Sequence, residues 1–227
     1  MIAKTIVSAV LLLTIKNLAA DPARSIEGPE FMGRKVTLTE AETDEDGLFP
    51  KGPASLCVEG PPERQCYTAP KDFGRMPTAA GVMLAKDIPA LLFSAASGGV
   101  SGFNIHFALL RPRSGKELDD LFQGGITVSN QNQYAFWTES AISDTPIFVT
   151  ADYVWGPTEG HYDAHRYLIS VYVAEGLYYY LDDRYMTVRK YDQEANPDIP
   201  GSEKPEILAR LKRVKAERER RQPTPAR

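Results

Sequence analysis

Arg166–Val173 (RYLISVYV) and Leu177–Lys190 (LYYYLDDRYMTVRK) decide the fold, because both are rich in the aromatic and β-branched residues of strands. Ala174-Glu175-Gly176 separates them and is a connection of hairpin size. This segment therefore predicts two neighbouring antiparallel strands.

The same pattern of short apolar runs extends towards the N-terminus as far as residue 79. Clusters of Gly, Pro, Ser and Asn separate the runs, as turns separate strands. Lys116–Phe122 (KELDDLF) interrupts them and favours one or two helical turns. We therefore predict an all-β fold, with antiparallel sheets that are blade-like or form a sandwich. The predicted strands are Val82–Leu84, Ala90–Phe93, Asn104–Leu110, Ile126–Val128 and Pro146–Thr150, together with the hairpin.

A weak internal repeat is present at an offset of 57 residues. Asp87–Ala95 (DIPALLFSA) matches Asp144–Asp152 (DTPIFVTAD) in pattern. Each copy is followed by a Gly-containing loop and a longer strand, Phe103–Leu110 or Arg166–Val173. The pattern favours two units of similar plan. Chance similarity between apolar strands that follow a proline is the alternative.

Composition limits the class of protein. The chain has 227 residues, of which 43% are hydrophobic and 25% charged, with a formal net charge of −4. These values are typical of globular domains and exclude a collagen-like, disordered or polytopic membrane chain. The length allows one or two domains.

Residues 1–20 have the order of a secretory signal peptide. Lys4 precedes the apolar run Thr5–Ile15, and Leu18-Ala19-Ala20 offers a cleavage site. Lys16 ends the run before it reaches the length of a membrane span, about 20 residues. We expect export to the periplasm or outside the cell, with no transmembrane span after signal removal. A buried N-terminal helix is the alternative.

The segment 21–53 is expected to be irregular apart from the alternating run Val36–Thr39 (VTLT), which could form a strand, and 54–200 is expected to be the β domain. Cys57 and Cys66 are the two cysteines of the chain, and Gly60-Pro61-Pro62 forms a turn signal between them. In an oxidising compartment such a pair predicts a disulfide that closes a hairpin-like loop.

Residues 201–222 are predicted to form a basic C-terminal helix, with 223–227 as a tail. Ser202 is the expected cap, and Ile207, Leu208, Leu211 and Val214 form its apolar stripe. Residues 204–227 carry a net charge of +6, whereas residues 21–203 carry −12. The first half should dock on the domain. The second half is expected to project into solvent, to lie against the acidic body, or to meet an anionic partner or envelope protein.

Residues 159–165 are the one candidate metal cluster. In an extended segment Glu159, His161, Asp163 and His165 would project to the same side, and their side chains are suitable ligands for zinc. Gly160 and Gly156-Pro157 indicate a loop instead, where the same groups would bond to their own backbone. The chain lacks a phosphate-binding loop, a dinucleotide fingerprint and a nucleophile elbow.

Aromatic residues are concentrated in one region. Nine of the eleven tyrosines fall between Tyr153 and Tyr191. Most are explained by packing across strands. Tyr153 and Trp155 are the candidates for an exposed ligand-binding surface, because their rings combine an apolar face with a polar group.

Val149–Asp192 resembles uncharacterised exported bacterial β proteins, through Ala151–Gly156 (ADYVWG), His161-Tyr162 and His165-Arg166-Tyr167. The strand–loop–strand units of residues 80–192 are also similar to single blades of FG-GAP or VCBS-type β-propellers. The Asp-rich calcium loop of those repeats has no counterpart here, and two units do not close a propeller. The resemblance implies no activity.

These observations predict an exported, non-catalytic β protein that binds a ligand or associates with the envelope, and not a nucleic-acid-binding protein. The alternative is a secreted hydrolase with a metal at 159–165. A third interpretation is a subunit of an envelope assembly that docks through its C-terminal helix.

Overall fold

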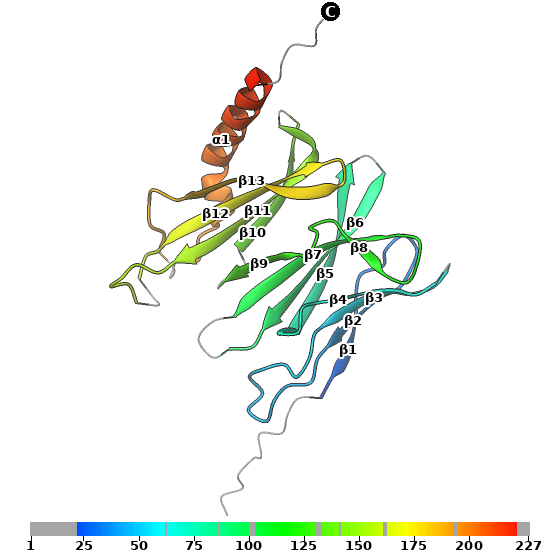
Figure 1. The fold of residues 1–227 in the computed structure, drawn as a ribbon. Coiled ribbons are helices and arrows are strands. Elements are labelled where there is room, and N and C mark those ends of the chain that lie inside the picture. The colour runs from blue at the N-terminus through cyan, green and yellow to red at the C-terminus, as the bar shows by residue number, and fades with distance from the viewer. Residues whose placement is uncertain are drawn as a thin grey trace, which may run out of the picture.

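The computed structural model describes residues 22–61, 63–85, 87–99, 103–129, 133–140, 142–160, 163–192 and 195–221. The predicted signal peptide and the tail at 223–227 lie outside them. The described part forms thirteen strands and one helix (Figure 1). They are β1 (Arg24–Glu27), β2 (Val36–Glu40), β3 (Ser55–Val58), β4 (Gln65–Thr68), β5 (Phe73–Ala85), β6 (Ile88–Ser97), β7 (Asn104–Pro112), β8 (Leu118–Asp120), β9 (Ile126–Ser129), β10 (Gln133–Glu139), β11 (Ser143–Val154), β12 (Arg166–Glu175), β13 (Tyr178–Met186) and α1 (Ile199–Arg221).

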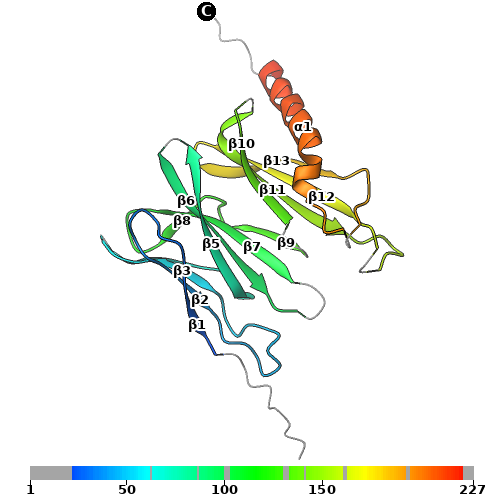
Figure 2. The same cartoon turned by 180° about the vertical axis from the view of Figure 1, so that it is seen from behind.

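Three antiparallel sheets follow one another along the chain (Figures 1 and 2). The first has the order β1-β2-β3-β4 and the third the order β10-β11-β12-β13. The second has the order β5-β6-β7-β8, with β9 also paired to β7. The predicted all-β class with a C-terminal helix is thus confirmed. The predicted hairpin is β12–β13, in which Glu175 pairs with Tyr178.

The second sheet is covered on both faces, which explains why β6 and β7 are almost continuously apolar. Leu91, Phe93 and Ala95 of β6 pack with the first sheet, whereas the alternate residues Leu92 and Ala96 pack towards the third. The remaining face of the third sheet carries α1. The molecule is therefore a stack in the order first sheet, second sheet, third sheet, helix.

The repeat falls on equivalent positions of two sheets. Asp87–Ala95 covers most of β6, and Asp144–Asp152 lies within β11. Each is the second strand of a consecutive four-stranded path, and the strands that follow, β7 and β12, are the third. The two copies therefore occupy the same place in similar sheets.

The segment 21–53, expected to be irregular, contains β1 and β2 of the first sheet. β1 has no apolar alternation of its own. It is a strand because all four of its residues pair with β2, from Arg24 opposite Glu40 to Glu27 opposite Thr37. The expected strand at Val36–Thr39 is therefore confirmed as β2, whereas the expectation of irregular structure was wrong at β1, and the β structure begins at Arg24.

The expectation of a helical turn at Lys116–Phe122 was also wrong, because Leu118–Asp120 forms β8. Leu118 and Leu121 of this segment are both buried. The Asp120 carboxylate fixes the turn that follows by accepting the backbone N–H groups of Phe122 and Gly124, each at 3.0 Å.

The predicted disulfide is present. Cys57 of β3 is directly opposite Cys66 of β4, their Cα atoms are 4.1 Å apart, and the sulfurs are bonded. The bond closes the β3–β4 hairpin, which contains the predicted turn.

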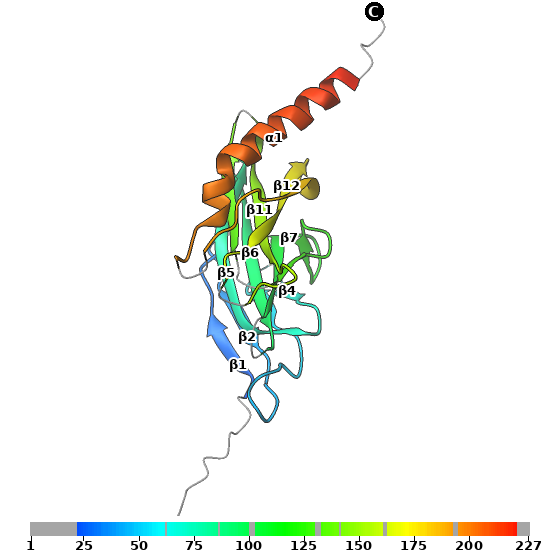
Figure 3. The same ribbon diagram turned by 90° about the vertical axis from the view of Figure 1, so that its left-hand side faces the viewer.

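The helix α1 begins at Ile199, earlier than the predicted start at residue 201. Asp198 caps it in place of Ser202, because its Oδ1 accepts the Gly201 N–H at 2.9 Å. Ile207 and Leu211 are buried against the third sheet, as the apolar stripe predicted, while Leu208 is half-buried. Figure 3 shows the later turns of α1 extending past the sheet.

A β-bulge in β13 joins the helix to the sheet electrostatically. Val171 pairs with Asp183 but Tyr172 pairs with Leu181, so Asp182 is an extra residue. Both adjacent carboxylates contact α1: Asp183 accepts from Arg210 at 2.5 and 3.2 Å, and Asp182 pairs with Arg218 at 2.6 Å. The basic helix therefore lies against acidic groups of its own domain.

Candidate functional site

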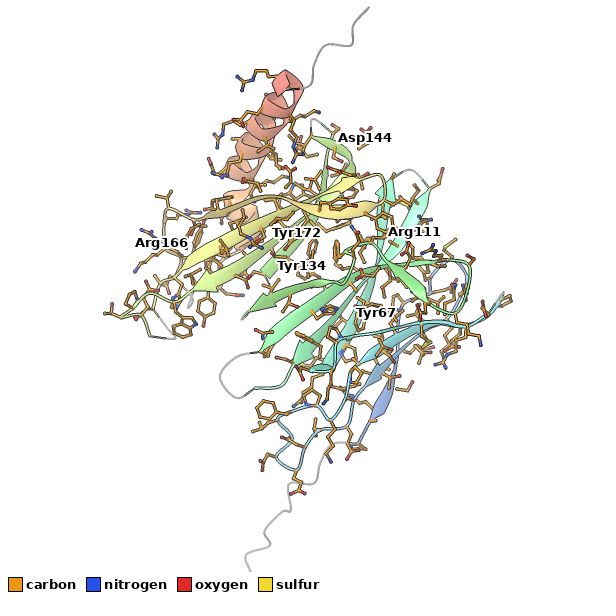
Figure 4. All side chains as sticks on the ribbon, in the orientation of Figure 1. Tyr67, Arg111, Tyr134, Asp144, Arg166 and Tyr172 are labelled. Carbon is orange, nitrogen blue, oxygen red and sulfur yellow. A yellow bond between two sulfur atoms is a disulfide. The ribbon has the colours of Figure 1, made fainter. Side chains whose placement is uncertain are left out.

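The candidate site lies where β11 ends and β12 begins, beside Arg166 in Figure 4. Tyr153 is near the end of β11, and Trp155 follows the strand directly. The loop returns through His165, whose backbone exchanges two hydrogen bonds with Tyr191, at 3.0 and 2.8 Å. This bridge brings residues after β13 against the loop.

His165 is the centre of the cluster. Its side chain is 0% exposed, and its ring centroid lies 4.6 Å from that of Tyr153 and 5.2 Å from that of Trp155. Nδ1 is 2.9 Å from Oε2 of Glu159, whereas Nε2 has no hydrogen-bond partner in the described part of the chain. A carboxylate acceptor at Nδ1 places a ring proton on that nitrogen.

Glu159 is held by three donors. Besides His165, the Gly156 N–H donates to Oε2 at 2.7 Å, and Lys190 Nζ lies 2.6 Å from Oε1. Lys190, Gly156 and His165, in that order, lower the pKa of Glu159 to about 2. A Cβ at Gly156 would come within 2.6 Å of the carboxyl carbon, so glycine is needed for this close approach.

Glu159, Asp163 and His165 of the predicted metal cluster do not lie in an extended segment. Turn hydrogen bonds run from Glu159 N–H to Gly156 O and from Asp163 N–H to Gly160 O, each 3.2 Å long. Asp163 accepts the Gly160 N–H at 2.5 Å, and Glu159 orients His165. Among the described residues no three ligating side chains gather into a metal site.

The zinc site at these positions thus remains a prediction that needs His161, which lies outside the described residues. A carboxylate that orients a histidine is a common second-layer arrangement around metals. The alternative function, a secreted hydrolase, depends on the same histidine, His161.

The two predicted ligand-binding residues have different roles. Trp155 is 48% exposed, whereas Tyr153 is 3% exposed. The centroids of the two rings are 5.2 Å apart. Tyr153 and His165 therefore support the indole from the interior, and Trp155 presents the surface.

Sequence reasoning missed Lys190 and Tyr191. They are 25 or more residues from His165, and only the bridge after β13 brings them close. No local spacing in the sequence predicts this contact. The available signal was that the predicted final strand ends at Lys190.

A hollow lies between the second and third sheets, away from Trp155, and has a volume of about 450 Å³. Figure 4 shows Tyr172 and Tyr134 in this inter-sheet region. The consecutive tyrosines are partly structural here: the Tyr179 hydroxyl donates to Pro146 O at 2.8 Å and the Tyr178 hydroxyl to Asp119 at 3.1 Å. Packing thus explains most of the tyrosine cluster.

His106 forms another buried polar pair, between the first and second sheets. Its Nε2 is 2.8 Å from the hydroxyl of Tyr67, which Figure 4 labels, and its Nδ1 has no partner within the described residues. Burial lowers the pKa of His106 to about 4. This pair joins two layers of the stack away from the Trp155 loop.

The chain matches no known protein-family model, no curated protein and no solved structure. Its resemblance to exported bacterial proteins and to propeller blades therefore remains a prediction. No helix in the described ranges is long and apolar enough to cross a membrane.

Proposed function

We propose that the protein is an exported, non-catalytic binding protein that holds its ligand against the indole of Trp155. The observation that carries the proposal is a half-exposed tryptophan on a fixed buried base, made of Tyr153 and His165. A rigid aromatic surface binds with little loss of conformational freedom, which favours recognition.

The arrangement around His165 supports binding over catalysis. The imidazole is buried behind Tyr153 and Trp155, so a substrate on the surface does not reach its nitrogens. Glu159 is ionised and shared among Lys190, Gly156 and His165, which suits an anchor and not a general acid. The residues thus serve to position the indole.

Export to the periplasm or outside the cell is part of the proposal. The supporting observations are the apolar run behind Lys4 and the Cys57–Cys66 disulfide, a bond typical of oxidising compartments. Mass spectrometry of the protein recovered from the periplasm and medium should find a chain that begins near residue 21. A full-length cytoplasmic chain would contradict export.

The binding test uses the small number of tryptophans. The chain has two, so Trp137→Phe leaves Trp155 as the single indole emitter. We expect at least one class among oligosaccharides, aromatic amides and Pro-rich peptides to shift its emission saturably. In a separate titration by calorimetry, Trp155→Ala should abolish the binding and Trp155→Phe should retain part of it. If no probe class binds, or Trp155→Ala binds as well as the parent, the function is refuted.

The outer surface of α1 favours a second interaction. Lys212 and Lys215 are both exposed on α1. They can attract an anionic partner or an acidic envelope protein. Binding to vesicles that contain anionic lipid should weaken with salt and with Lys212→Gln/Lys215→Gln. Equal binding by the variant would exclude this surface for anionic lipid.

A further inference from the structure

We infer that the ligand class of the Trp155 site is a neutral sugar ring with adjacent hydroxyl groups. This inference rests on the proposed binding function and specifies its ligand. It follows from the combination of one apolar surface with a donor–acceptor pair of zero net charge.

The apolar half of the site is the Trp155 indole. Its ring is half-exposed, while contacts with Tyr153 and His165 fix its orientation. A pyranose ring with mostly equatorial hydroxyls has a flat face of C–H groups. Covering the indole with that face removes apolar area of both partners from water.

The polar half is the pair formed by Glu159 and Lys190. Three contacts connect the pair to the indole. The ring centroids of Trp155 and His165 are 5.2 Å apart, His165 Nδ1 lies 2.9 Å from Glu159 Oε2, and Lys190 Nζ lies 2.6 Å from Glu159 Oε1. The Lys190 side chain is half-exposed, and its ammonium group has three N–H donors, of which Glu159 takes one. The Glu159 side chain is 13% exposed and has three donors, so its carboxylate keeps one acceptor position. One sugar hydroxyl would accept from the ammonium while its neighbour donates to that position.

Charge favours a neutral ligand over an anionic one. The lysine and the ionised glutamate cancel, and residues 21–203 carry a net charge of −12. An acidic sugar would compete with Glu159 for Lys190 and would meet the repulsion of the acidic body. A planar aromatic ligand would cover the indole but would leave the ion pair without a ligand partner. The neutral sugar uses both halves.

The test is a titration of the Trp137→Phe protein, followed by Trp155 emission. Neutral hexasaccharides of glucose and of N-acetylglucosamine are compared with trigalacturonate, N-acetyl-tyrosinamide and a Pro-rich peptide. We expect saturation by a neutral hexasaccharide at about millimolar concentration, a weak affinity that suits a single-ring site. In calorimetry without the Trp137 change, Trp155→Ala should lose this binding and Lys190→Met should weaken it at least about fivefold, a ratio equal to about 1 kcal/mol.

Glu139→Gln provides the control, because this half-buried residue ends β10, where it pairs with Ser143 at the end of β11 away from the site. It should bind like the parent, and unchanged melting temperatures should show that all variants are folded. Saturation by trigalacturonate, the amide or the peptide, without the neutral sugars, would overturn the sugar inference and leave the binding function standing. Full affinity in Lys190→Met would overturn the role of the ion pair. Absence of any Trp155-dependent binding would overturn both proposals.

Discussion

Acid should destabilise the protein through His106 from about pH 6.5 downwards, before ordinary carboxylates begin to titrate. In the folded state burial lowers the pKa of this imidazole from 6.5 to about 4. The unfolded chain therefore binds a proton between these two pH values that the folded chain does not bind. By proton linkage, the free energy of unfolding must fall as pH decreases through this window.

The size of the effect follows from the pKa difference. Each pKa unit corresponds to about 1.4 kcal/mol, so His106 should remove about 3 kcal/mol of stability between pH 7 and pH 4. Nδ1 has no partner among the described residues, so protonation there gains no hydrogen bond that would reduce this loss. For a domain whose total stability is of the order of 5–15 kcal/mol, this is a large fraction.

The assay is urea unfolding of the parent and of His106→Gln at pH 7, 5 and 4. Gln retains a side-chain amide that can bond to Tyr67 but does not titrate. The constant cost of altered packing cancels, because only the change between pH values is compared. The parent should lose about 3 kcal/mol more than the variant between pH 7 and pH 4. Equal losses in the two proteins would refute the reasoning.

Three further perturbations test other parts of the fold. Leu211→Asp should lower the free energy of unfolding by at least about 3 kcal/mol, since it places a carboxylate in the core under α1. The control Ala216→Asp, on the exposed side of the helix, should change little. Similar melting temperatures for the two variants would show that the helix does not dock. Reducing Cys57–Cys66 should cost roughly 2–3 kcal/mol in urea unfolding, whereas an unchanged midpoint would remove its structural role. Glu159 adds stability above about pH 4.5 that is lost as pH falls towards 2, so Glu159→Gln should flatten the thermal stability profile in that range; an unaltered slope would contradict its ion pairing.

Strands with a pattern of their own were predictable from the sequence, and strands formed by pairing were not. β6, β7, β11 and β12 are apolar enough to be recognised in isolation. β1 is not, because its RSIE sequence becomes a strand only through its register with β2. β8 was not predicted either, because Leu118-Asp119-Asp120 forms a strand only through its pairing with β7.

The candidate site was predictable to the same extent. Trp155 and His165 could be selected from local composition, but Lys190 could not, because a bridge between distant segments brings it to Glu159. The expectation that four side chains share one side assumed strand alternation. The turns at Gly156 and Gly160 break that alternation, and the Asp163 carboxylate accepts the backbone N–H of Gly160 instead.

The sequential order of the sheets has a consequence for synthesis. Each sheet uses consecutive strands, so every layer is complete before the next one leaves the ribosome or the export channel. The second sheet is apolar on both faces, and until β10–β13 follow, the face that carries Leu92 and Phe107 has nothing to cover it. A chain stalled or cleaved after β9 would expose that face, and such fragments should be a preferred target for chaperones and proteases.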